Sequence, residues 1–310
     1  MNSPRLSGNR LPMPEYPDVP VSFSERWDLC RFLTCSVLPV RMACNLHCPF
    51  CFSRSSVSSL RSDAAVDWNR MNIESYYEFA KERGATRLVI TGGGEPLLRP
   101  NDVISLIRRG RSFFDEIACF TNGSRLTREL SHQLQDAGLS YLCYSRHHHD
   151  DQRCRELMGD QAPGLNEFIA AAGSIRIRAT CVMTRGWIDT LTLVDEYIDT
   201  LSRYGVREFT FKHTYVAYPQ SVFGKSDANA WSRIHQVEFD PFRGRGEVVA
   251  QLPWGPQVRQ IGSNQVCYYF EPTPNWELEN QLCRSSNLLS DGTVYGSLED
   301  SRSQLFQLSH

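Results

Sequence analysis

The chain of 310 residues is long enough for one large domain or two modest ones. Its hydrophobic content of 41% and charged content of 22% are typical of a globular protein, and its net charge of −2 gives no electrostatic reason to expect nonspecific nucleic-acid binding. No run approaches about 18 apolar residues, so we expect no membrane span. The first twenty residues lack the apolar core of a secretory signal, which favours a cytoplasmic location.

After residue 35 the sequence alternates between strand-like and helix-like patterns. Asn72 is a candidate N-cap, and Gly84, Gly138 and Gly205 each follow a helical pattern as a stop signal. Such alternation predicts parallel strands with right-handed crossovers, either in a doubly wound sheet or in a full or partial (β/α) barrel. In both architectures the functional groups lie where strands end. Strands are expected at residues 36–42, 87–91, 116–122, 141–145, 175–184 and 207–215, with helices at 72–84, 101–110, 127–138, 165–173 and 190–205.

The pattern changes at residue 216. The remaining sequence is rich in Pro, Trp and other aromatic residues, and short strand-like pieces at 247–252 and 265–270 are separated by turns. We therefore expect an N-terminal arm, a barrel and a C-terminal extension that covers one end of the barrel. These three parts are predicted at residues 1–34, 35–215 and 216–310.

Three of the eleven cysteines lie within eight residues, as Cys44, Cys48 and Cys51. Without an export signal a disulfide framework is not expected, and metal binding is the better interpretation. Soft thiolate ligands select zinc, copper or an iron–sulfur cluster. Structural zinc needs four protein ligands, and His47 is the only nearby fourth candidate. Three ligands on a four-iron cluster would leave one iron open, so the cluster is favoured, with zinc and coincidence as alternatives.

The segment TGGGEP, residues 91–96, follows the next expected strand. Three glycines allow a backbone to approach a ligand closely, and Glu95 adds an acceptor. The alternative is a plain glycine-rich turn between strand and helix. Isolated cysteines in apolar strands, namely Cys119, Cys143 and Cys181, are expected to be buried core residues.

These motifs together resemble the radical S-adenosylmethionine (SAM) superfamily over residues 36–215. The resemblance is carried by the spacing of the three cysteines, by Phe50 before the last of them, and by the GGEP sequence of residues 93–96. It implies a partial (β/α)6 barrel of the α/β class and one [4Fe-4S] cluster held by the three cysteines. It also implies that SAM chelates the open iron and is cleaved to a 5′-deoxyadenosyl radical that removes hydrogen from a substrate.

The resemblance also implies roles for residues at the strand ends. Gly93, Gly94 and Glu95 are expected to contact the SAM amino group, and Phe50 is expected near the adenine. Polar residues that end the fourth and fifth strands bind ribose and carboxylate in such enzymes. The residues matched to these contacts are Ser145 for the ribose and Arg178 for the carboxylate, with Thr121 and Asn122 as weaker cofactor-binding candidates.

Strand alternation supports part of this assignment independently. In residues 175–184 the arginines and threonines share one face, which predicts a polar lumen that suits a carboxylate or phosphate. A structural salt bridge is the alternative for each arginine. In SRHHHDD, Ser145, His147 and His149 share a face, and His147 is the weak candidate for substrate contact, against a solvated loop histidine. Lys212, also a weak candidate, and His213 lie on opposite faces, so at most one should point inward.

The C-terminal extension resembles a degenerate SPASM or twitch turn that begins at Cys283. Gly296 stands where such relatives often have cysteine, and Cys267 and Cys283 are the only thiols in the region, so a single cluster is expected. Some epimerases of the superfamily quench a substrate radical with a thiol hydrogen. Cys267 and Cys283 are the candidates for that catalytic role, with a packed thiol as the alternative.

The sequence thus favours a radical SAM enzyme that oxidises or epimerises a small polar substrate such as a sugar, aminoglycoside, nucleoside or amino-acid derivative. A reductant such as flavodoxin or ferredoxin would supply the electron. One alternative is a peptide-modifying maturase, although the segment before the barrel is short for a winged-helix peptide-recognition domain. The other is a zinc-stabilised or catalytically inactive binding barrel.

Overall fold

The computed structural model describes residues 26–60, 66–219 and 221–308. Within them a single twelve-stranded sheet has the order β12-β11-β10-β1-β2-β3-β4-β5-β6-β9-β8-β7. Its core strands are β1 (Arg31–Val37), β2 (Arg87–Ile90), β3 (Glu116–Thr121), β4 (Tyr141–Ser145), β5 (Arg176–Val182) and β6 (Glu208–Lys212). The remaining strands are β7 (Glu247–Gln251), β8 (Gln257–Ile261), β9 (Asn264–Tyr269), β10 (Leu282–Leu288), β11 (Thr293–Tyr295) and β12 (Gln304–Gln307).

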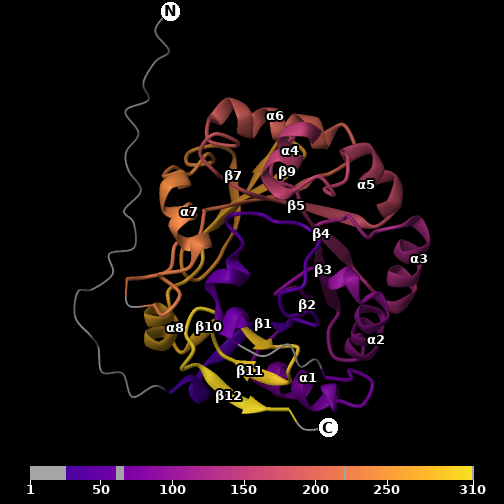
Figure 1. Ribbon diagram of the computed structural model, residues 1–310, viewed down its shortest axis with the longest axis vertical. Coiled ribbons are helices and arrows are strands. Elements are labelled where there is room, and N and C mark those ends of the chain that lie inside the picture. The colour runs from indigo at the N-terminus through magenta and orange to yellow at the C-terminus, as the bar shows by residue number, and fades with distance from the viewer. Residues whose placement is uncertain (1–25, 61–65, 220, 309–310) are drawn as a thin grey trace, which may run out of the picture.

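The strands from β10 through β1 to β6 and β9 are parallel, and antiparallel strands follow at both edges. Figure 1 shows the sheet curled around a central space, with helices on its outer side. This is a partial barrel of the α/β class, as the sequence predicted. The helices are α1 (Ile73–Glu82), α2 (Pro100–Gly110), α3 (Arg128–Ala137), α4 (Asp151–Met158), α5 (Leu165–Ala172), α6 (Leu191–Ser202), α7 (Asp227–His235) and α8 (Pro274–Asn280).

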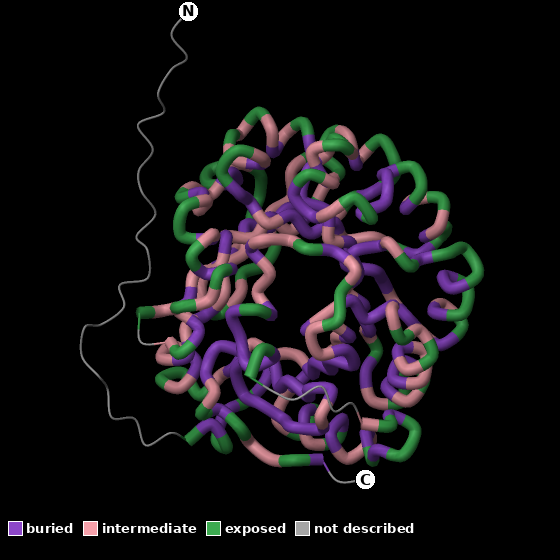
Figure 2. Tube along the Cα trace, viewed as in Figure 1, coloured by how far each residue is buried: buried purple, intermediate pink, exposed green. Residues whose placement is uncertain are grey.

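The predicted helix signals are confirmed where the structure tests them. The Asn72 side chain accepts a hydrogen bond from the Ser75 amide at the start of α1. Gly138 ends α3 with a φ of 113°, a backbone conformation that favours glycine. The apolar faces of the helices pack on the outer face of the sheet, where Cys119 and Cys181 belong to the main core, whereas Cys143 lies in a smaller cluster with Ala118 and Tyr141; all three thiols are buried as expected. Figure 2 shows the buried residues gathered along the strands and the exposed ones on the outer helices.

Two expectations about elements were wrong. The first strand covers residues 31–37 rather than 36–42. Beyond Val37 the chain turns, and the Val40 carbonyl accepts hydrogen bonds from the amides of Gly93 and Gly94 rather than from the amides of a neighbouring strand. Helix α4 was missed after the histidine run. Asp150 caps it by accepting from the Arg153 amide at 2.8 Å.

The C-terminal region extends the sheet at both edges. Strand β10 pairs in parallel with β1, and β9 pairs in parallel with β6. Residues 271 and 284, next to or within these strands, therefore lie beside the central space. The three-part division stays a prediction, and residues 1–25 of the expected arm lie outside the described residues. Among the described residues no helix is both long and apolar enough to cross a membrane.

Candidate functional site

A cavity of about 220 Å³ opens at the carboxyl ends of the parallel strands. Its lining comes from the loops after β1, β2 and β3 on one side and from the ends of β4, β5, β6 and β9 on the other. This is the position that a parallel α/β fold gives to functional groups. Most residues that the sequence singled out for cofactor binding contribute to the same cavity.

All three clustered cysteines line this cavity. Burial raises the pKa of the Cys44 and Cys48 thiols, and the neighbouring thiols raise both pKa values further. Thiolates held so close repel one another unless positive charge lies between them, which is the environment a metal cluster supplies. Among the described residues no group of three His, Cys, Asp or Glu side chains is placed to hold a single metal ion.

Gly93 and Gly94 hold the cysteine loop by direct backbone contact. The amides of Gly93 and Gly94 donate to the Val40 carbonyl at 3.0 and 3.1 Å. A Cβ atom on Gly93 would lie 1.5 Å from the Arg41 carbonyl oxygen, and one on Gly94 would lie 1.8 Å from that of Ala43. No side chain fits there. Gly94 also lines the cavity, so the segment both packs the loop and faces the site.

Glu95 organises the adjoining wall. Its buried carboxylate accepts from the Thr121 hydroxyl and the Asn122 amide, both at 2.7 Å, and from the Leu97 amide at 3.0 Å. Burial raises its pKa. The Asn122 side chain lies 3.6 Å from the Cys44 sulfur. The structure thus brings Glu95, Thr121 and Asn122 together beside the cysteines.

The fourth strand alternates as predicted. Ser145 and His147 line the cavity, whereas Arg146 points away and is buried against Asp151 at 2.5 Å. His149, expected on the same face as His147, instead lies 3.6 Å from Glu196.

His147 is held in one orientation and one tautomer. Its Nδ1 accepts from the Val182 amide at 3.0 Å, so the ring hydrogen resides on Nε2. The ring meets Phe50 edge to face, with ring centroids 4.8 Å apart. Burial, aided by the charges of Lys212 and Arg146, lowers the pKa of His147 to about 3, so the ring is neutral.

The far wall contains Lys212, His213, Tyr215, Phe270 and Glu271. Lys212 donates to Glu271 at 2.9 Å. Both Lys212 and His213 contribute to the lining, but their side chains bind different partners. Lys212 donates to Glu271, which also lines the cavity, whereas the His213 ring bonds to the Tyr268 hydroxyl at 3.0 Å, outside the lining, so the expectation that at most one points inward is not contradicted. Glu271 was missed, although it follows directly after a strand-like run and the same strand-end rule would have found it.

Comparison with known proteins supports this arrangement. A model of the radical SAM superfamily matches residues 39–176, which include all three cysteines and the glycine segment. Residues 39–176 of the chain are thus a radical SAM superfamily domain. Its cofactors are therefore a [4Fe-4S] cluster and SAM, and a crystal structure of SuiB from Streptococcus suis bound to SAM shares the fold. SuiB is 16% identical, with a TM-score of 0.56 over 89% of this chain and 63% of that one.

Curated relatives match shorter parts of the chain. A GTP 3′,8-cyclase from Pseudomonas putida is 31% identical over 164 residues, which are 50% of this chain and 45% of that protein. An AdoMet-dependent heme synthase from Methanosarcina barkeri is 32% identical over 102 residues, which are 33% of this chain and 28% of that protein. The chain thus spans less than half the length of these two relatives.

The cavity residues fit the radical SAM cofactors. The thiolates of Cys44, Cys48 and Cys51 would hold the cluster, and the polar groups of Glu95 and Ser145 face the same space for SAM. When bound, the two cofactors supply the 5′-deoxyadenosyl radical of the family.

Arg178 is not among the residues that line the cavity. It lies deeper on the same strand face, where its guanidinium pairs with Glu208 at 2.8 Å and contacts the Tyr141 hydroxyl at 3.3 Å. Thr180 and Val182, the next residues on that face, reach the cavity instead. Alternation predicted the face of Arg178 but not its depth or its partner, and a contact with the SAM carboxylate has no support in this arrangement.

The two candidate hydrogen-donor thiols also lie outside the lining. Cys283 is fully buried on β10, opposite Phe32 of β1, and the neighbouring Cys30 thiol together with burial raises its pKa. Cys267 is buried in the middle of β9, opposite Thr210. Neither position gives a thiol access to a substrate in this cavity.

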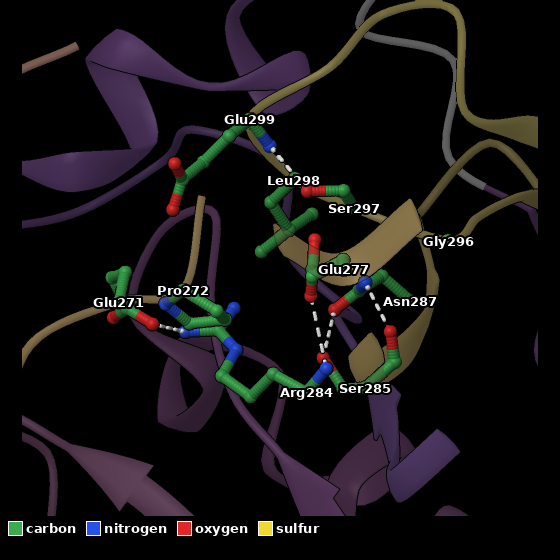
Figure 3. A pocket seen from close by; sticks show the side chains of 10 residues that line it. All are labelled: Glu271, Pro272, Glu277, Arg284, Ser285, Asn287, Gly296, Ser297, Leu298 and Glu299. Atoms are coloured by element: carbon green, nitrogen blue, oxygen red, sulfur yellow. Dashed lines mark hydrogen bonds and ion pairs between the residues drawn. The ribbon is translucent and has the colours of Figure 1, made fainter. Parts of the chain in front are cut away.

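A second, water-sized cavity of about 10 Å³ lies behind Glu271 (Figure 3). Arg284 binds Glu271 from this side, and its amide donates to Glu277 at 2.9 Å. Burial raises the pKa of Glu271, but the charges of Arg284 and Lys212 outweigh burial and hold it at about 2. Burial raises the pKa of Glu299 and raises that of Glu277 to about 7. The ion pair of Glu271 and Arg284 thus lies beside the carboxyl groups of Glu277 and Glu299, whose raised pKa values favour their neutral forms.

Substitution of Gly93 by alanine tests the backbone contact. We expect Gly93→Ala to displace the cysteine loop and to lower iron content after anaerobic reconstitution by roughly half or more, because the new Cβ overlaps a carbonyl oxygen. Gly224→Ala is the matched control, since its Cβ would meet the nearest atom at 3.3 Å. Full iron content in Gly93→Ala would contradict the assigned contact.

Glu277 should make stability depend on pH. Its pKa rises from 4.5 to about 7 on folding, so the folded state binds the proton more tightly than the unfolded state. The free energy of unfolding should therefore fall by roughly 3 kcal/mol as pH rises through this interval. In Glu277→Gln most of that slope should disappear, as measured by denaturant unfolding at several pH values. The exposed Glu279→Gln is the control, and parallel pH profiles for all three proteins would refute the assignment.

Proposed function

We propose that the protein abstracts a hydrogen atom from a small polar substrate held between the cluster side of the cavity and its far wall. The observation that supports this is one cavity lined by three thiols at one side and by Lys212 and Glu271 at the other. A purely structural metal site has no need of a facing charged wall. A substrate with polar groups would be oriented there toward the radical.

The chain's own residues would prepare the site for radical chemistry. Four phenylalanines line the cavity and exclude water from a reactive intermediate. Neutral His147 offers an Nε2–H donor, and Lys212 offers an ammonium group. Because Cys267 and Cys283 lie outside the lining, the arrangement favours oxidation over an epimerisation quenched by either thiol. The phenylalanines are Phe50, Phe52, Phe120 and Phe270.

A peptide substrate is the second candidate. The structure of SuiB bound to its precursor peptide SuiA shares the fold with a TM-score of 0.54 over 87% of this chain, a span that exceeds the barrel and extends into residues 216–310. At 15% identity this likeness supports the fold alone. Saturable binding of a precursor peptide would favour the maturase, whereas turnover of a free small molecule would favour the main proposal. A protein reductant such as flavodoxin or ferredoxin is proposed as the electron source in both cases.

The test is anaerobic reconstitution followed by reaction with SAM and dithionite. We expect about four irons per chain and formation of 5′-deoxyadenosine, both lost in Cys48→Ala. Cys154→Ala is the matched control, because Cys154 packs beside Cys48 but does not line the cavity. About eight irons would overturn the single-cluster proposal. Bound zinc without 5′-deoxyadenosine would overturn the enzymatic proposal in favour of a binding barrel.

A further inference from the structure

The cavity contains hydrogen-bond donors, on Lys212 and His147, that the described residues do not saturate. We propose that Lys212 and His147 form a subsite for a carboxylate group, which deepens the proposed function and rests on it. Both side chains line the cavity, from the ends of β6 and β4. Strand β5 lies between them, so their backbones are about 10 Å apart, a distance that the long lysine side chain reduces.

Lys212 has hydrogen-bonding capacity to spare. Its ammonium group has three hydrogens and donates one to Glu271 at 2.9 Å. The Nζ atom lies 5.1 Å from the centre of the Tyr269 ring, which contributes a cation–π contact from another side. The side chain remains 27% exposed, and that exposure is toward the cavity it lines. A ligand oxygen can therefore accept a charge-assisted hydrogen bond there.

The charge of Lys212 is not fully cancelled by its neighbours. Glu271 is shared between Lys212 and Arg284 and also accepts from the Tyr269 hydroxyl at 2.7 Å. One carboxylate facing two cations leaves an excess of one positive charge in this cluster. The carboxyls behind it, Glu277 and Glu299, do not offset this charge fully, because burial favours their neutral forms. A monoanion would complete the balance, whereas a phosphate dianion would exceed it.

His147 supplies a second donor. Since Nδ1 accepts from Val182, the hydrogen on Nε2 is available, and among the described residues Nε2 has no hydrogen-bond partner in the protein. The ring is 4% exposed and edges onto Phe50, so it cannot turn freely. An ammonium and a fixed N–H match the two oxygens of one carboxylate. Arg178, by contrast, is already paired with Glu208 and lies outside the cavity.

The carboxylate can come from the substrate or from the methionine part of SAM, and binding measurements separate these sources. In the first arm, equilibrium dialysis measures the Kd of SAM and of decarboxylated SAM for the reconstituted wild type, Lys212→Met and Lys212→Arg. Lys225→Met is the exposed-lysine control. In the second arm, amino acids and 2-hydroxy acids are each compared with their amides by the EPR spectrum of the reduced SAM-bound cluster.

Two results would support the subsite. If SAM provides the carboxylate, Lys212→Met should weaken SAM binding by roughly tenfold, with smaller changes for decarboxylated SAM and for Lys212→Arg. If the substrate provides it, the Kd of SAM should stay unchanged while an acid, but not its amide, perturbs the EPR spectrum of the wild type and not of Lys212→Met. Iron content equal to wild type in each variant shows that the fold and cluster are intact.

Two other results would overturn it. The subsite would be refuted if Lys212→Met binds SAM as tightly as the wild type and no acid gives different EPR spectra for the two proteins. Formation of 5′-deoxyadenosine in that case would still support the proposed function. A wild type that neither binds SAM nor forms 5′-deoxyadenosine would refute both.

Discussion

The site depends on a close contact between two stretches of backbone. The glycine segment after β2 lies so near the cysteine loop after β1 that two carbonyl oxygens occupy the places where Cβ atoms would otherwise stand. Backbone amides of the segment donate to that loop. Because backbone contacts leave little rotational freedom, three otherwise flexible thiols are held toward one cavity. The side chain of Glu95, the next residue, accepts hydrogen bonds from Thr121 and Asn122 at the end of β3. These bonds fix the loop after β3 and complete the cysteine side of the cavity.

The other side of the cavity depends on the C-terminal region. Strands β9 and β10 extend the parallel sheet at opposite edges, and each brings one member of the buried ion pair. Glu271 follows β9, and Arg284 lies on β10. Their contact joins the two edges of the curled sheet behind Lys212. The extension therefore sets the charge that a substrate would meet, which explains why a barrel of six strands alone would present a different site.

Much of this was accessible from sequence because it rests on local patterns. Helical stop glycines, caps and strand alternation predicted the alternating core, and the spacing of Cys44, Cys48 and Cys51 indicated a group of thiols, which the structure places in one cavity. The depth of a side chain in the barrel and its bonding partner could not be predicted from the sequence, since both depend on strands that are distant in sequence. The pairing of Arg178 with Glu208 needs the β5–β6 register, and the burial of Cys283 needs β10 to lie beside β1. The ion pair of Glu271 with Arg284 was hidden because the two residues come from opposite edges of the sheet.

The most direct test of the account is a crystal structure of the reconstituted protein with SAM, with iron located by anomalous scattering. We expect iron atoms bonded to the sulfurs of Cys44, Cys48 and Cys51, with SAM between Glu95 and Ser145. We also expect the far wall of Lys212 and Glu271 to face the adenosyl carbon across the cavity. Iron bound elsewhere, or a metal that takes a fourth ligand from the protein, would contradict it.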